Sequence, residues 1–137
     1  MQVINAYESI NLSKKTLSEL IKFCKTISEK FKLQKYPDVR VILVSDDYIK
    51  ELNKKFLGID NPTNVLTFPL DNIHEIYVSV DTVRREFGNH DLLKGIAYYI
   101  LHALLHLEGY SDTFENQKKF MDKLHQRFWE QIEKWNP

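Results

Sequence analysis

The chain has 137 residues, of which 43% are hydrophobic and 28% are charged, a composition typical of one globular domain. Nineteen basic and nineteen acidic residues balance, and this formal net charge of zero argues against binding nucleic acid through bulk charge. Cys24 is the only cysteine, which excludes a disulfide framework and a thiolate zinc cluster. We expect one domain over residues 1–137, located in the cytoplasm, with neither a signal peptide nor a membrane-spanning segment.

The N-terminal third of the sequence predicts one strand and one helix. Gln2–Tyr7 alternates weakly between apolar and polar residues, which indicates a short strand. Ser13 is a suitable N-cap for a helix whose apolar residues recur at intervals of three and four as far as Phe31. Cys24 lies on this apolar stripe, so we expect it to be a core residue and not a nucleophile.

The middle of the sequence predicts three further strands and a helix. Val39–Val44 has the β-branched density of a buried strand, and the helix after it begins at Ser45 and ends at Gly58. Asn64–Phe68 is flanked by prolines, which favours an edge strand. Glu75–Val80 follows after a short polar link, so the two strands are expected to pair antiparallel.

Three helices are predicted in the remainder of the chain. Asp81 is the expected cap of a short helix, and Asp91 that of a long one. A wide apolar arc on the long helix indicates that it is central and nearly surrounded, with Tyr98, His102 and His106 on a separate stripe. An amphipathic pattern over residues 114–135 predicts the last helix.

The end of the long helix carries a pattern of metal ligands. His102 and His106 are four residues apart and share one helix face, Gly109 permits a reversal of the chain, and Asp112 follows three residues later. Two imidazoles and a carboxylate are a legitimate ligand set for zinc, with an open position for a water molecule. The alternative is that both histidines are core groups bonded to neighbours, while Asp112 only caps the last helix.

The same pattern argues against a peptidase. In the zincin peptidases a glutamate follows the first histidine and deprotonates the metal-bound water, and here that position holds Ala103. Glu108 lies two residues beyond His106, so helix geometry turns it away from the histidine face. We therefore assign no protein side chain as the catalytic base.

Two motifs in this order resemble those of the YbeY family of metal-dependent endoribonucleases, which are associated with maturation of 16S ribosomal RNA. The segment 62–69 reads P-T-N-V-L-T-F-P, similar to the family's P-T-D-V-L-S-F-P, and 102–110 reads H-A-L-L-H-L-E-G-Y. The resemblance runs from about Val39 to the C-terminus. It implies an α+β fold in which a small mixed sheet packs against helices, and a central helix carries the histidine motif.

The sequence departs from the family pattern at several positions. The third metal-binding histidine of the family falls at Asp112, an arginine near its active site falls at Leu57, and a lysine falls at Ile59. Two histidines with one carboxylate still suit one divalent cation, zinc first, with Fe²⁺, Mn²⁺ or Ni²⁺ as alternatives. Candidate substrate-binding residues are Thr63, Asn64, Thr67, Lys55 and Arg84.

Three functions are therefore considered. The first is a metal-dependent endoribonuclease that binds ribosomal RNA and the small ribosomal subunit, with His102, His106 and Asp112 as ligands and no membrane partner. The second is a ribosome-associated protein of the same fold with impaired catalysis, motivated by Leu57. The third is a metallohydrolase acting on peptides or small molecules, motivated by the ligand spacing.

Overall fold

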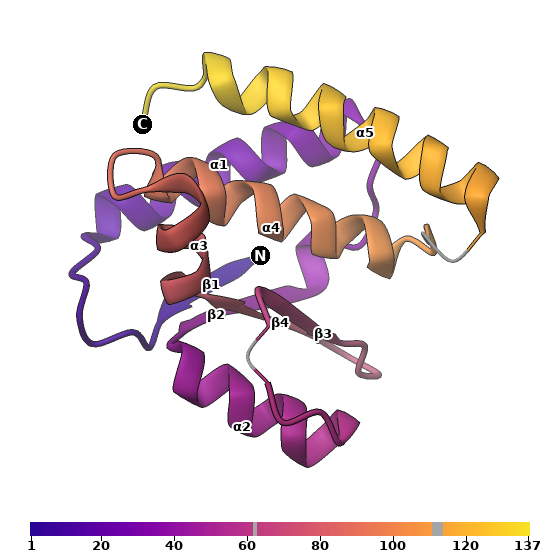
Figure 1. Ribbon diagram of the computed structural model, residues 1–137. Helices are drawn as coiled ribbons and strands as arrows, with labels where there is room; N and C mark the ends of the chain where they lie inside the picture. Colours follow the sequence, from indigo (N-terminus) through magenta and orange to yellow (C-terminus); the bar gives the residue numbers. More distant parts are fainter. Residues whose placement is uncertain (62, 111–113) are drawn as a thin grey trace.

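The described part of the chain forms a sheet of four strands in the order β1-β2-β4-β3 (Figure 1). The computed structural model describes residues 1–61, 63–110 and 114–137. The strands span Gln2–Asn5 (β1), Val39–Val44 (β2), Val65–Phe68 (β3) and His74–Ser79 (β4). The pairs β1-β2 and β2-β4 are parallel, while β3 lies at the edge and pairs antiparallel with β4. The predicted mixed sheet, edge strand and antiparallel pair are all confirmed.

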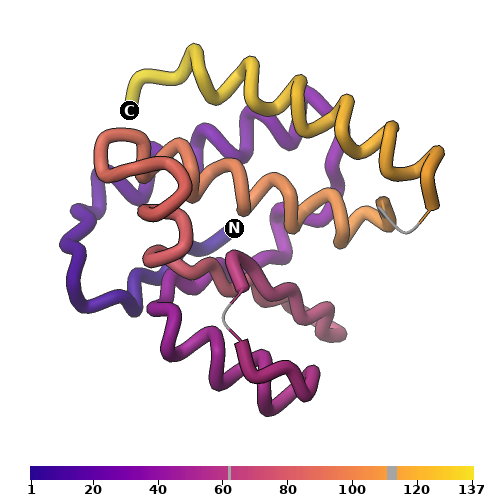
Figure 2. The backbone as a smooth tube through the Cα atoms, viewed as in Figure 1, coloured from indigo at the N-terminus to yellow at the C-terminus, as the bar shows by residue number. Residues whose placement is uncertain are grey.

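Five α-helices surround this sheet in the part of the chain that the structure describes. They span Lys14–Lys30 (α1), Asp46–Leu57 (α2), Val80–Phe87 (α3), Leu92–Leu107 (α4) and Glu115–Lys134 (α5), with a 3₁₀ turn at Tyr36–Asp38. The backbone trace shows α1 and α5 along α4 on one face of the sheet and α2 on the other (Figure 2). No helix in the described ranges combines the length and the hydropathy that crossing a lipid bilayer requires.

Helix ends follow the expected local chemistry at several places. The Ser13 side chain accepts a hydrogen bond from the Thr16 amide (3.1 Å), and Ser45 accepts one from the Tyr48 amide (3.2 Å). Gly58 ends α2 in the left-handed conformation, with φ of 71°. These three predicted termini are confirmed.

The start of α3 differs from the prediction. Ser79, and not Asp81, is the N-cap, because its side chain accepts a hydrogen bond from the Thr82 amide (3.3 Å). The Asp81 carboxylate instead accepts hydrogen bonds from the Asp46 amide (2.8 Å) and the Tyr7 hydroxyl. Asp81 is therefore used to join the first turns of α2 and α3 to the segment after β1.

Two other expected features are also corrected. β1 ends at Asn5 and not at Tyr7, because the Asn5 side chain accepts a hydrogen bond from the Tyr7 amide (3.0 Å) and turns the chain. Asp91 occupies the position before α4, but its side chain makes no capping hydrogen bond there.

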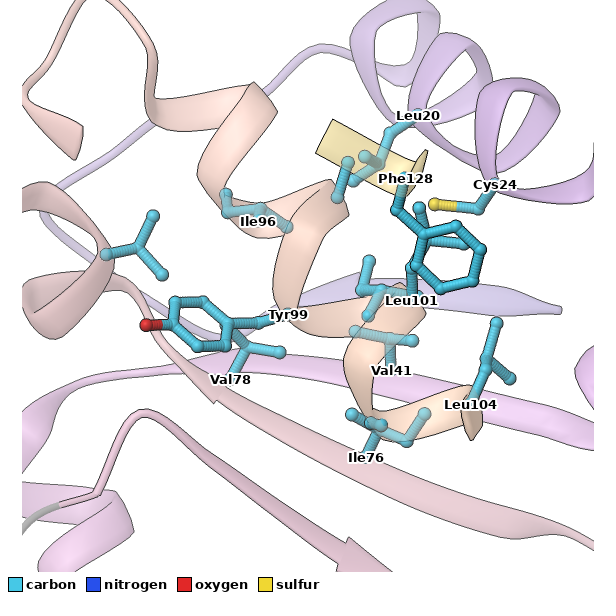
Figure 3. Packing of buried hydrophobic residues seen from close by; sticks show 14 of the residues in the cluster. Leu20, Cys24, Val41, Ile76, Val78, Ile96, Tyr99, Leu101, Leu104 and Phe128 are labelled. Carbon is cyan, nitrogen blue, oxygen red and sulfur yellow. The ribbon is translucent and has the colours of Figure 1, made fainter. Parts of the chain in front are cut away.

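The main core lies between the sheet and the layer formed by α1, α4 and α5. Helix α4 is central to it, since Ile96, Leu101 and Leu104 are fully buried (Figure 3). Cys24 is also fully buried, which confirms its expected place in the core, and burial raises the pKa of its thiol to about 12. A smaller cluster on the opposite face holds α2 against the sheet through Val44, Ile49 and Leu66.

Helices α3 and α4 approach closely at Gly95. A Cβ atom there would lie 2.5 Å from Val83 Cγ1 and 2.6 Å from Phe87 Cδ2. Both neighbours belong to the packed side of α3, so neither can move away without disturbing the core. The spacing of these two helices therefore requires a residue without a side chain.

We predict that Gly95→Ala destabilises the protein. Overpacking should exceed the helix propensity gained, giving a net loss of about 1–2 kcal/mol in the free energy of unfolding. Urea denaturation measures it, and Ser18→Ala, at an exposed position within α1, is the control for helix propensity alone. Equal stabilisation by both substitutions would contradict the close approach.

A polar network ties α2 to α3 at the ends of β2 and β4. The Asp46 carboxylate accepts hydrogen bonds from Ser79 (2.6 Å), Thr82 (2.9 Å) and Arg85 (2.6 Å). Burial on its own would raise the pKa of Asp46, but these hydrogen bonds outweigh it and hold the pKa below its ordinary value of 3.8. The ionised form of Asp46 therefore stabilises the fold.

We predict that Asp46→Asn lowers the free energy of unfolding at pH 7 by about 1–2 kcal/mol, because a charged acceptor is lost. A lowered pKa gives stability that is present above the ordinary pKa and lost as the pH falls through the folded value. The difference from the wild type should therefore shrink below about pH 4. Urea denaturation at pH 7 and pH 3 measures it, with the exposed Asp47→Asn as control. A difference that is unchanged at pH 3 would refute the assignment.

Candidate metal centre and its surroundings

The two histidines of the motif meet on one face of α4, where the fully buried arc of the helix ends. Their Nε2 atoms lie 3.1 Å apart and their ring centroids 4.6 Å apart. Both side chains are half-buried, whereas Ala103, Leu104 and Leu105 between them are buried. The four-residue spacing thus places two ring nitrogens together at the margin of the core.

This pair fits a divalent cation. Zinc binds imidazole nitrogens at about 2.0–2.1 Å in tetrahedral geometry, which places two such nitrogens about 3.3 Å apart. Two lone pairs that face each other at 3.1 Å repel, so the pair needs a shared proton or a cation between its members. Asp112, the third predicted ligand, lies outside the described residues. Among the described residues no three His, Cys, Asp or Glu side chains are placed so that they could hold one metal ion, so the metal centre stays a prediction.

The turn after the histidine motif directs the Glu108 side chain away from the histidine pair. Its carboxylate accepts hydrogen bonds from the backbone amides of Gln34 (2.5 Å) and Lys35 (2.6 Å), in the connection after α1. Gly109 follows with φ of 99°, in the region that favours glycine, and ends the helix. Glu108 therefore joins α4 to a loop and does not face the histidine pair, in agreement with the expected helix geometry.

A third histidine, from α5, lies against the pair. His125 Nε2 is 2.7 Å from His102 Nδ1, and the two ring centroids are 4.6 Å apart. The Tyr98 ring lies on the same side, 5.7 Å from the His125 ring between centroids. His102 thus contacts one histidine through each of its two ring nitrogens.

Tyr99 connects α4 to the start of β3 and to α3. Its hydroxyl accepts a hydrogen bond from the Asn64 side chain (3.1 Å) and donates one to the Glu86 carboxylate. Burial, followed by the hydrogen bond to Glu86, raises the pKa of Tyr99 well above its ordinary value. The Tyr99 hydroxyl therefore keeps its proton at neutral pH and serves as a hydrogen-bond donor to Glu86, while it holds Asn64 beside α4.

An aromatic pocket opens next to the histidines. Its volume is about 410 Å³. Its lining comes from α3, α4 and α5 and consists of Glu86, Phe87, Tyr98, Tyr99, His125, Gln126 and Trp129. His125 belongs both to this wall and to the contact with His102, so the pocket lies beside the histidines and shares one residue with them.

Three of the five predicted substrate-binding residues lie together at β3. Asn64 contacts α4 through Tyr99, and Thr67 shares the sheet face of Val65, which packs into the main core on the α4 side. Thr63 precedes Asn64 and is half-buried. These three are close to one another in the chain, at the start of β3 and within it.

The two predicted cationic residues lie apart from the histidines. Lys55 is exposed on α2, which covers the opposite face of the sheet from α4 (Figure 1). The Arg84 guanidinium lies over the Tyr7 ring, 5.6 Å from its centroid, and donates a hydrogen bond to the Tyr7 hydroxyl (3.4 Å). The described structure therefore does not bring these two charges to the pair.

Sequence reasoning missed His125 and Glu86. A weak signal for His125 exists, because it lies one turn after the buried Met121 and beside Leu124, at the border of the apolar face of α5. A polar ring at such a border needs a partner, but its identity depends on how α5 packs against α4. Glu86 is exposed and carries no comparable signal.

Comparison with known proteins agrees with the fold described above. The family model described as Endoribonuclease YbeY matches residues 2–133. The solution structure of TM1509 from Thermotoga maritima is similar with a TM-score of 0.63 and 36% identity, over 96% of this chain and 89% of that one. The chain is thus an α+β protein of the fold class that this solution structure represents.

The family model shows the family, and named relatives agree with it. An Endoribonuclease YbeY of Thermotoga maritima is 48% identical over 93 residues, 62% of this chain and 61% of the relative, which is less than two thirds of its length. The protein of that name from Syntrophomonas wolfei is 28% identical over 149 residues, 95% of each chain. The chain belongs to the Endoribonuclease YbeY family.

Proposed function

We propose that the protein is a metal-dependent endoribonuclease that acts on ribosomal RNA in maturation and quality control of the small ribosomal subunit, in the cytoplasm. The observation that carries the proposal is the approach of His102 Nε2 and His106 Nε2 to 3.1 Å on α4, in a chain whose family is named for endoribonuclease activity. The matched region includes both histidines and the segment from Thr63 to Phe68.

The residues have the following roles in this proposal. His102, His106 and Asp112 hold one divalent cation. When bound, this cation would act as a Lewis acid and lower the pKa of a water molecule on it. The pair lies at the margin of a core in which Ala103 and Leu105 are fully buried, so one side of the site is closed to water. That apolar wall strengthens the electrostatic interactions at the pair.

The RNA lies along β3 in the proposed complex. β3 is an edge strand, and among the described strands its outer side has no partner, so its backbone groups are available to a ligand. Asn64 and Thr67 provide an amide and a hydroxyl on the side of α4, and Tyr99 holds Asn64 in place. Because the net charge is zero, recognition depends on these local groups and not on a general positive field.

A second function is favoured by a specific observation at the end of α2. Leu57 and Ile59, where the family pattern has an arginine and a lysine, are 58% and 50% exposed. Neither can stabilise charge that develops on a phosphate. A ribosome-associated protein with impaired catalysis is therefore the alternative. The peptide or small-molecule hydrolase gains no support, since the position of the missing glutamate is the fully buried Ala103.

We predict that the untagged protein binds about one zinc ion and that His106→Ala loses stoichiometric binding, because two of the three proposed ligands do not form a closed set. Asp112→Ala should weaken zinc affinity as well. Elemental analysis and competition with a chromophoric chelator measure both effects. The control is His90→Ala, which removes an exposed histidine at the other end of α4. Wild-type protein without stoichiometric metal would overturn the proposed centre.

We predict that the metal-loaded wild type cuts 16S ribosomal RNA, and that His106→Ala lowers the rate at least about 100-fold. Gel-resolved cleavage of end-labelled RNA measures this, with His90→Ala as the matched control. Absence of cleavage by the zinc-loaded wild type would favour the impaired alternative. In that case Leu57→Arg, which restores the family's cation, tests whether the loss of that charge is the cause.

A further inference from the structure

His102 lies between two histidines, and its two ring nitrogens take different hydrogen-bonding roles toward them. Its Nε2 faces His106 Nε2 at 3.1 Å, and its Nδ1 faces His125 Nε2 at 2.7 Å. A neutral imidazole has one protonated nitrogen, which donates, and one unprotonated nitrogen with a lone pair. His102 therefore donates in one of the two contacts and offers its lone pair in the other. The group that contacts Nδ1 therefore determines whether Nε2 carries a proton or a lone pair.

A cation held by the pair requires the lone pair of His102 at Nε2. The proton of His102 must then be on Nδ1, where it is donated to His125 Nε2 over 2.7 Å. His125 accepts it only if its own proton is on Nδ1. One assignment of protons thus satisfies the 2.7 Å contact and leaves the nitrogens of His102 and His106 available to a cation. Histidine ligands of metals generally donate their second N–H group in this way.

The position of His125 is fixed by the packing of α5. Met121 and Phe128, one turn before it and about one turn after it, are 1% and 0% exposed, so this part of the helix is anchored in the core. The His125 ring is half-buried and tilted by 33° to the His102 ring. An acceptor held this firmly limits rotation of His102 at little further cost in entropy.

We infer that His125 is a positioning residue of the metal centre: it accepts the Nδ1–H hydrogen bond of His102 and so keeps the Nε2 lone pair of His102 directed to the cation. This inference rests on the divalent cation of the proposed function. His125 itself contacts the Nδ1 side of His102, away from the nitrogen that faces His106. It acts through His102 and is not counted among the ligands.

The experiment compares zinc affinity in three variants of the full chain by competition with a chromophoric chelator. His125→Leu removes the acceptor and should weaken zinc binding about 10- to 100-fold. His125→Gln places an amide oxygen near the position of Nε2 and should remain within about threefold of the wild type. His90→Leu removes an exposed histidine away from the pair and should have no effect.

A spectroscopic measurement separates positioning from a general structural role. In the zinc-loaded wild type, long-range ¹H–¹⁵N spectra of the imidazoles should show a hydrogen-bonded proton on His102 Nδ1 and no metal bond on either nitrogen of His125. The proton signal should be lost in His125→Leu. Urea denaturation of the metal-free proteins should show that His125→Leu and His125→Gln are both folded.

Several outcomes would overturn the inference. Wild-type zinc affinity in His125→Leu would do so, as would a ¹⁵N shift that marks His125 as a zinc ligand. Equal weakening in the Gln and Leu variants would also contradict the role of an acceptor. A wild type that binds no zinc overturns this inference together with the proposed metal. Zinc binding with the predicted order of affinities but without RNA cleavage would overturn the proposed nuclease alone.

Discussion

The burial of α4 is the constraint on which the rest of the structure depends. Ten of its sixteen residues are buried, with the sheet on one side and α1 and α5 on the other. A helix so enclosed can carry polar side chains only where the surrounding layer ends, because an unsatisfied polar group in a core costs about 1–3 kcal/mol. His102 and His106 occupy that margin, and each faces another ring nitrogen. The same packing that stabilises the fold therefore creates the candidate site.

The polar contacts around α4 join elements that are distant in the sequence. Tyr99 reaches Asn64 before β3 and Glu86 on α3, while Glu108 reaches the backbone at Gln34 and Lys35. These contacts lie at opposite ends of the histidine motif. They hold the edge strand and the connection after α1 at fixed positions relative to the helix. The geometry of a site built on α4 is thus set by groups outside the site.

Much of the fold could be predicted from sequence because its elements have strong local signals. The caps at Ser13 and Ser45 and the glycine at 58 act within one turn, and the antiparallel pair β3-β4 follows from a short link. The predicted N-cap of α3 is wrong because either Ser79 or Asp81 could cap the helix. A tertiary contact with the Asp46 amide engages the Asp81 carboxylate and leaves Ser79 as the cap. Local chemistry allows both choices, and only the packed structure selects one.

The site was less accessible to sequence reasoning, since its partners come from separate helices. The histidine pair follows from a four-residue spacing, but His125 enters only through the packing of α5 on α4. Lys55 shows the converse, because a charge close in sequence to the segment 62–69 lies on α2, which covers the other face of the sheet from the histidines. Met121 and Phe128 hold His125 in place, so substitutions in this part of the core act on the histidines without touching them. A cavity at Phe128 would loosen α5. It should therefore disturb the orientation of His102 while the protein is still folded, as expected when a site relies on packed neighbours.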